Sequence, residues 1–66
     1  MSDILTLDEV RALCALADMK LYLSAGDRGT WLAHLVDYKT GHRSYRSAYD
    51  KDIAANAVWE AYVNNR

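Results

Sequence analysis

Residues 30–49, with the sequence TWLAHLVDYKTGHRSYRSAY, predict a β-hairpin. Two runs rich in aromatic and β-branched residues, 30–37 and 42–49, flank the four residues from Tyr38 to Gly41. Gly41 stands where a type I turn followed by a bulge requires a positive φ, which glycine adopts without a steric penalty. This hairpin is the centre of the fold that we expect.

The register of the hairpin decides which side chains share a face. If Tyr38 pairs with His42, Asp37 lies opposite Arg43 as a cross-strand ion pair. One face then contains Trp31, Ala33, Leu35, Tyr45, Ser47 and Tyr49, and the other contains Leu32, His34, Val36, Ser44, Arg46 and Ala48. The number of aromatic residues on one face favours this register. A shift of one residue would exchange the faces.

A helix is predicted to begin after Thr6. Thr6 and Glu9 have the spacing of a capping box, in which each side chain accepts a hydrogen bond from the other residue's backbone amide. No helix-breaking residue follows until Gly26, so we expect one long helix over about residues 7–25, with Gly26 as the left-handed residue after its end. The alternative is a helix that ends near Asp18, followed by a strand over residues 20–23, which also alternate in polarity.

The long helix would have apolar residues on two sides. The first group is Val10, Leu13, Cys14, Ala17 and Leu21, and the second is Ala12, Leu16, Met19 and Leu23. A helix on a protein surface needs only one apolar stripe. We therefore expect the hairpin and a second helix, or a partner, to cover the second group.

A turn is predicted at residues 26–29, and Asp50 is predicted to cap a second helix over about residues 53–64. One side of that helix contains Ala54, Ala55, Val58, Trp59, Ala61 and Tyr62, and the other contains Asn56, Glu60 and Asn64. The predicted fold class is α+β. A long N-terminal helix, an antiparallel hairpin of two strands (three under the alternative) and a C-terminal helix form one small domain over residues 1–66, with both helices on one face of the sheet.

The chain has 66 residues, of which 52% are hydrophobic, so its core is small. An isolated two-stranded hairpin is marginal in water. Packing of the helices, or extension of the sheet across a homodimer, must complete the fold.

The sequence argues against catalysis and against metal binding. It has one cysteine, and its histidines, His34 and His42, have no carboxylate or thiol at a catalytic or metal-binding spacing. We expect a protein that is not an enzyme and has no metal and no cofactor. A signal-peptide pattern and a long apolar run are both lacking, which favours a cytoplasmic protein that does not contact the membrane.

Charge is distributed unevenly along the chain. Residues 28–51 contain five basic and two acidic residues, whereas the rest of the chain contains three basic and seven acidic residues. A basic hairpin is typical of a surface that binds an anionic partner. One function hypothesis is therefore a nucleic-acid-binding module that uses Lys39, His42, Arg43 and Arg46, with Tyr38 stacking on a base.

Under the three-strand alternative, the order of elements resembles the double-stranded RNA-binding domain over nearly the whole chain. The matching residues are Gly29-Thr30-Trp31, the hairpin, and the alanine-rich segment Ala54-Ala55-Asn56-Ala57-Val58-Trp59. That family begins its last helix with paired lysines that bind phosphate, whereas this chain has Asp50-Lys51-Asp52. The resemblance implies an RNA-binding function, and this departure puts the phosphate contact in doubt.

Residues 31–62 also resemble the small arm-binding domains at the front of tyrosine recombinases. The agreement lies in Trp31, Gly41 and the helical segment Ala57-Val58-Trp59-Glu60-Ala61. Those domains have three strands, and the resemblance implies that the sheet reads DNA.

A second hypothesis follows from size and from apolar surface. The chain resembles in size the accessory proteins of phages and mobile elements, which act by occupying a surface of a larger protein. We expect such a non-enzymatic regulator or inhibitor to bind through large, rigid side chains, which supply most of the energy of an interface. The candidate partner-binding residues are Met19, Tyr22, Tyr38, Trp59 and Tyr62.

Overall fold

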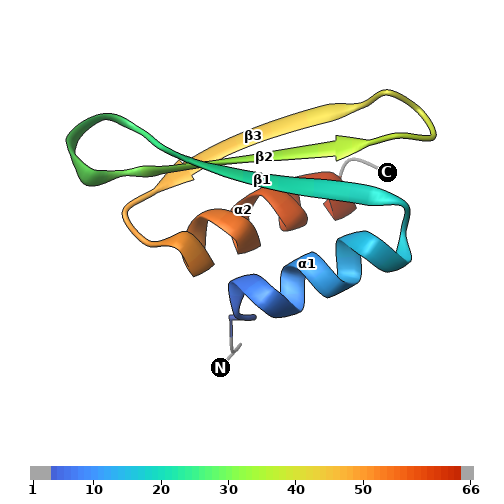
Figure 1. Cartoon of the computed structure of the whole chain (residues 1–66), viewed down its shortest axis with the longest axis horizontal. Helices are drawn as coiled ribbons and strands as arrows, with labels where there is room; N and C mark the ends of the chain where they lie inside the picture. Colours follow the sequence, from blue (N-terminus) through green and yellow to red (C-terminus); the bar gives the residue numbers. More distant parts are fainter. Residues whose placement is uncertain (1–3, 65–66) are drawn as a thin grey trace.

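The computed structural model describes residues 4–64 as an α+β fold (Figure 1). The elements follow in the order α1 (Leu7–Leu16), β1 (Met19–Ala25), a 3₁₀ turn (Asp27–Gly29), β2 (Trp31–Asp37), β3 (Arg43–Ala48) and α2 (Lys51–Asn64). The strands form an antiparallel sheet in the order β1-β2-β3. Both helices lie on the same side of this sheet, so its other side is not covered by a helix.

Helix α1 begins as predicted and ends earlier than predicted. The capping box is present, because the Glu9 amide donates to Thr6 Oγ1 at 3.2 Å and the Thr6 amide donates to Glu9 Oε1 at 2.9 Å. The helix ends at Leu16, and Asp18 adopts a left-handed conformation with φ of 58°. Aspartate is one of the few residues other than glycine that enters this region readily. The prediction of one long helix over residues 7–25 is therefore wrong, and the alternative, with a strand at residues 20–23, is confirmed.

Gly26 connects two strands rather than ending a helix. Its φ is −101°, which is extended, and its amide donates to the Thr30 carbonyl at 2.8 Å. A Cβ at this position would lie 2.5 Å from Thr30 Oγ1, so a larger residue at position 26 would require the Thr30 side chain to shift. The left-handed residues of this turn are Arg28 and Gly29, and the turn predicted at residues 26–29 is confirmed.

The hairpin is confirmed, but its register differs by one residue from the predicted one. Arg43 lies opposite Val36, and His34 lies opposite Tyr45. Trp31, Ala33 and Leu35 share one face of β2 as predicted, and this face is turned to the helices. The β3 side chains are exchanged between the faces, so Tyr45 and Ser47 lie on the uncovered face and Ser44 lies on the helix side. The predicted ion pair between Asp37 and Arg43 is replaced by other contacts of Asp37.

The turn geometry explains this shift. The Asp37 amide donates to the His42 carbonyl at 2.9 Å, which closes a loop of four residues rather than three. Gly41 has the expected positive φ, of 76°, and its amide donates to the Asp37 carbonyl at 2.8 Å. One further residue in the loop turns every β3 side chain to the opposite face.

The core lies between the sheet and the two helices. The buried apolar side chains are Val10, Cys14, Met19, Leu21, Ala33, Leu35, Ala54, Ala55 and Val58. Small alanines on α2 let this helix approach the sheet closely. Asp50 caps α2 as predicted, because its Oδ1 accepts from the amides of Asp52 at 2.8 Å and Ile53 at 3.3 Å.

The segment before α1 is held against α2 by side-chain hydrogen bonds. Asn56 accepts from the Leu5 amide at 3.0 Å and donates to the Leu5 carbonyl at 2.7 Å. Asp52 Oδ1 accepts from the Leu7 amide at 2.7 Å. Asn56, on the predicted polar side of this helix, is therefore half-buried and fixes the start of α1.

Candidate functional site

The uncovered side of the sheet is the candidate site, and we call it the open face. Its residues alternate along each strand with those that face the helices. They are Lys20, Tyr22 and Ser24 on β1, Leu32, His34 and Val36 on β2, and Arg43, Tyr45 and Ser47 on β3. Two of these nine side chains are cations, two are tyrosines, and none is a carboxylate.

An aromatic row crosses the centre of the open face. The His34 ring stacks on the Tyr45 ring, with centroids 4.3 Å apart and planes at 10°, and the Tyr22 ring lies 5.8 Å away on the other side. Neighbouring strands are themselves about 4.8 Å apart. Because this spacing matches the His34 to Tyr45 separation, these rings stand side by side on the sheet and direct their edges outward.

Some polar atoms of this aromatic row have hydrogen-bond partners within the protein and others have none. His34 Nε2 is buried and has no hydrogen-bond partner. The hydroxyls of Tyr22 and Tyr38 are hydrogen-bonded to each other at 2.8 Å, and this bond raises the pKa of Tyr38 above its usual value. A shallow pocket of about 310 Å³ lies among these side chains and is lined by Tyr22, His34, Val36, Tyr38 and Arg43.

The two layers of the molecule differ in charge. Helices α1 and α2 together have four acidic residues, Asp8, Glu9, Asp52 and Glu60, and two basic ones, Arg11 and Lys51. The Lys51 ammonium lies 4.6 Å from the centre of the Trp31 ring, away from the open face. The chain has a formal net charge of −1, whereas the open face itself has two cations, Lys20 and Arg43, and no carboxylate.

The structure does not gather the four residues predicted for nucleic-acid binding on one face. Arg43 lies on the open face. Lys39 lies in the hairpin loop, with its ammonium 3.6 Å from an exposed Asp18 carboxylate oxygen. His42 is exposed beside the same loop, and Arg46 extends from the other side of β3 and donates through Nη1 to the Tyr45 carbonyl.

Sequence reasoning missed Lys20, His34 and Tyr45 as members of the site. Lys20 was assigned to a helix, although its alternation with Leu21 and Tyr22 indicated a strand. Tyr45 was assigned to the face opposite to His34 because of the one-residue difference in register. No signal in the sequence distinguished a loop of three residues from a loop of four.

The five candidate partner-binding residues separate into three places. Met19 is 4% exposed and belongs to the core. Tyr22 lies on the open face and Tyr38 lies beside it in the hairpin loop, and both are exposed. Trp59 and Tyr62 are half-buried on α2, with ring centroids 5.9 Å apart.

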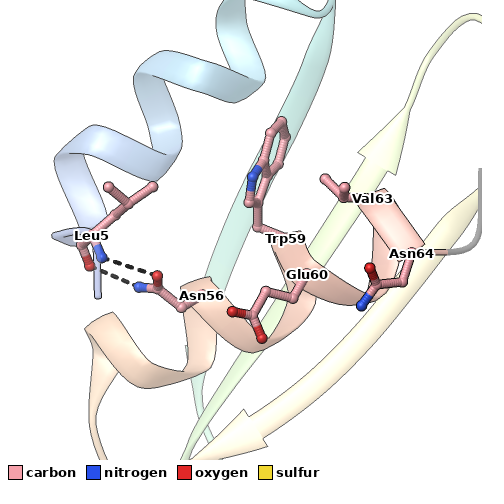
Figure 2. Close-up of a pocket in the computed structure, with 6 residues that line it drawn as sticks. All are labelled: Leu5, Asn56, Trp59, Glu60, Val63 and Asn64. Carbon is pink, nitrogen blue, oxygen red and sulfur yellow. Dashed lines mark hydrogen bonds between the residues drawn. The ribbon is translucent and has the colours of Figure 1, made fainter. Parts of the chain in front are cut away.

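A second pocket, of about 280 Å³, lies beside Trp59 on the helix layer. Figure 2 shows Trp59 and Val63 on the same side of α2, with Asn56 turned toward the Leu5 backbone. Because both polar ends of Asn56 already have partners, its amide is engaged in holding the chain together. Leu5, Trp59 and Val63 form the apolar part of this pocket, and Glu60 and Asn64 are its other polar residues.

Several other features bear on the chemistry of residues 4–64. In this part of the chain, no group of three or more histidine, cysteine, aspartate or glutamate side chains is placed to hold a metal ion. Burial raises the pKa of the Cys14 thiol, which reduces its reactivity. Neither helix over these residues is long and apolar enough to span a bilayer.

In comparisons with known proteins, no family model, no curated protein and no solved structure matches the chain.

Proposed function

We propose that this protein is a non-enzymatic nucleic-acid-binding protein that uses the open face. The observation that supports this proposal best is the composition of that face. Every polar side chain on it can donate a hydrogen bond, two of them are cations, and none is a carboxylate. Such a surface attracts a polyanion and has no group that repels phosphate.

The orientation of the rings favours a duplex over a single strand. A single strand binds sheets of this kind by stacking its bases on exposed ring faces. Here one face of the His34 ring is already occupied by Tyr45, and the rings direct their edges outward. Edges, hydroxyls and ammonium groups suit hydrogen bonds to phosphates and to base edges in a groove.

The dimensions of the sheet agree with this mode of binding. Three strands about 4.8 Å apart give a face about 10 Å wide between the outer strands. The major groove of B-form DNA is about 12 Å wide and accepts a helix or a two-stranded β-ribbon, which corresponds to two neighbouring strands of this face. The resemblance of residues 31–62 to the arm-binding domains of tyrosine recombinases, in which a three-stranded sheet reads DNA, supports the same proposal.

Binding to a larger protein, as a regulator or inhibitor, is the second candidate. It is favoured by the exposed Tyr22 and Tyr38 beside Arg43, because tyrosine and arginine are enriched among the residues that dominate protein interfaces. The charge of the open face would then select an acidic partner surface.

Fluorescence anisotropy with labelled duplex DNA, single-stranded DNA and duplex RNA tests the proposal. We expect duplex DNA to bind most tightly, and its affinity to fall steeply between about 50 and about 200 mM salt. Each of Lys20→Ala and Arg43→Ala should weaken binding and reduce the slope of log affinity against log salt by about 1. The matched control is Arg11→Ala, which removes an exposed cation from the helix layer and should leave the affinity unchanged.

The possible outcomes separate the candidates. No binding of any of the three nucleic acids at about 50 mM salt contradicts the proposal. Equal weakening by Arg11→Ala would mean that net charge, and not the open face, attracts the ligand. Binding of an acidic protein in the absence of any nucleic-acid binding supports the second candidate.

A further inference from the structure

We infer that a second copy of this chain pairs with the free edge of β1, so that two sheets join into one of six strands. This inference concerns a different surface from the open face and does not rest on the proposed function. It starts from the backbone groups that the sheet leaves without a partner.

The ladder between β1 and β2 determines which β1 groups point outward. The bond from the Gly26 amide to the Thr30 carbonyl marks one hydrogen-bonded pair, and such pairs alternate along antiparallel strands. Residues 20, 22 and 24 therefore bond to β2. The outward N–H and C=O groups belong to Met19, Leu21, Leu23 and Ala25, and within residues 4–64 no hydrogen bond from outside the sheet reaches them.

The other edge of the sheet is protected. By the same alternation, the outward groups of β3 belong to Arg43, Tyr45 and Ser47. The Arg46 guanidinium donates to the outward Tyr45 carbonyl, and two arginines lie within this short strand. Cations and a covered carbonyl are the means by which natural edge strands prevent pairing.

The edge of β1 has fewer of these protections. Its only charged side chain is Lys20, and the segment Leu21-Tyr22-Leu23-Ser24-Ala25 has no charge and no proline. A groove of about 300 Å³ separates this strand from α1 and is lined by Arg11, Cys14, Ala15, Met19, Lys20, Leu21 and Tyr22. Helix α1 therefore does not close the edge.

Charge and register favour a second copy as the occupant. Antiparallel self-pairing about a two-fold axis at Leu23 places Leu21 opposite Ala25 of the second copy, and every bond then joins outward groups. The two Lys20 side chains lie at opposite ends of the pair, so no like charges face each other. The two half-buried Leu23 side chains meet at the axis on the helix side.

The size of this contact sets the expected strength. Pairing of one strand buries less than the roughly 1,600 Å² of a standard interface. We expect a weak dimer with a dissociation constant between about 1 µM and about 1 mM. The two open faces would lie on the same side of the joined sheet, which doubles the cationic surface.

Sedimentation equilibrium over this concentration range measures the association. The wild-type average mass should rise from that of one chain toward that of two. Ala25→Pro removes an outward N–H without breaking the bonds to β2, and should keep the chain monomeric. Ser47→Pro removes the corresponding outward N–H of β3 and is the matched control, which should dimerise as the wild type does. Circular dichroism verifies that both variants are folded.

A second measurement does not depend on proline. Leu23→Cys places two thiols at the axis, where the Cα atoms of a hydrogen-bonded pair lie about 5.5 Å apart, a distance that a disulfide spans. Mild oxidation should give a linked dimer, whereas Tyr45→Cys, at the centre of the β3 edge, should give none. The native Cys14 is buried and should not interfere. A wild-type chain that stays monomeric at about 1 mM, or linkage through Tyr45→Cys and not through Leu23→Cys, overturns the inference.

Discussion

Tyr62, near the end of α2, donates its phenolic hydrogen to Asp37 Oδ2 at 3.2 Å. The other carboxylate oxygen of Asp37 accepts from the Lys39 amide at 2.9 Å, inside the hairpin loop. One buried carboxylate therefore joins the last helix to the turn between β2 and β3. This link holds the hairpin turn against the helix layer.

The charge of Asp37 should make the stability of the fold depend on pH. The Lys39 amide is the main cause that lowers the pKa of Asp37, and the Tyr62 hydroxyl adds to it. Because the pKa of Asp37 in the folded state lies below the unfolded value of about 3.9, the ionised carboxylate stabilises the folded state at a pH above about 3.9. This stabilisation is lost as the pH falls through the folded pKa. In Asp37→Asn this part of the acid dependence should disappear. Urea unfolding at a series of pH values measures it.

The control for this experiment is Glu60→Gln, which neutralises an exposed carboxylate on α2. It should retain the wild-type loss of stability in acid. If Asp37→Asn and the wild type lose stability in parallel below about pH 4, the charge of Asp37 is not the cause.

Asn56 should contribute to stability by holding the start of α1 against α2. Its side chain makes three hydrogen bonds to backbone groups, two with Leu5 and one with the Asp52 carbonyl. Asn56→Ala loses all three, and at about 1 kcal/mol each, with partial replacement by water, we expect the free energy of unfolding to fall by about 2 kcal/mol.

Asn56→Asp is the informative partner variant. It retains the acceptor for the Leu5 amide but loses the donor, and its charge faces two carbonyls. Its unfolding free energy should be at least as low as that of Asn56→Ala. Full wild-type stability of Asn56→Asp would show that the bond to the Leu5 amide alone holds the segment.

The sequence indicates the elements of this fold more securely than their boundaries. The capping box at Thr6, the hairpin turn at Gly41 and the cap at Asp50 are local patterns, and each is present. The end of α1 was missed because Asp18, rather than a glycine, adopts the left-handed conformation. Only the packing of β1 against β2 distinguishes this ending from a longer helix.

The candidate site was harder to predict because it depends on the register. Tyr45 lies beside His34 only because the loop has four residues, and Asp37, the last residue before this loop, contacts Tyr62, which is distant in the sequence. Charge alone predicted both Arg43 and Arg46 as site residues. Arg43 lies on the open face, whereas Arg46 lies on the other side of β3 and donates to the Tyr45 carbonyl. Charge along the sequence indicates which hairpin is basic, but the register decides which cations share a face.

The end of α1 at Leu16 leaves this leucine exposed, and its exposure can be tested by comparing it with a buried leucine, Leu35 of β2. Leu35 is 1% exposed in the core, whereas Leu16 is 86% exposed at the helix end. Leu35→Ala should lower the free energy of unfolding by about 2–5 kcal/mol, because it leaves a cavity. Leu16→Ala should change it by less than about 0.5 kcal/mol, as measured by urea unfolding. A large loss for Leu16→Ala would mean that this residue is covered, by a partner or by a longer helix.

The close approach of Gly26 and Thr30 gives a prediction with an internal control. A Cβ on residue 26 would lie 2.5 Å from Thr30 Oγ1, while its next contact, with the Thr30 carbonyl oxygen, is at 3.5 Å. Gly26→Ala should therefore destabilise the fold by about 1–3 kcal/mol, as overpacking typically does. In a Thr30→Ala background the obstructing hydroxyl is gone, and the same change should cost much less.

Thr30→Ala alone also has a cost, because Thr30 Oγ1 donates to the Asp27 carbonyl at 2.7 Å. All four proteins must therefore be compared in a double-mutant cycle by thermal or urea unfolding. We expect the double variant to be more stable than the sum of the single changes predicts, by about 1 kcal/mol or more. Additive effects would mean that the turn relaxes around the new methyl group, and that glycine is required at residue 26 for another reason.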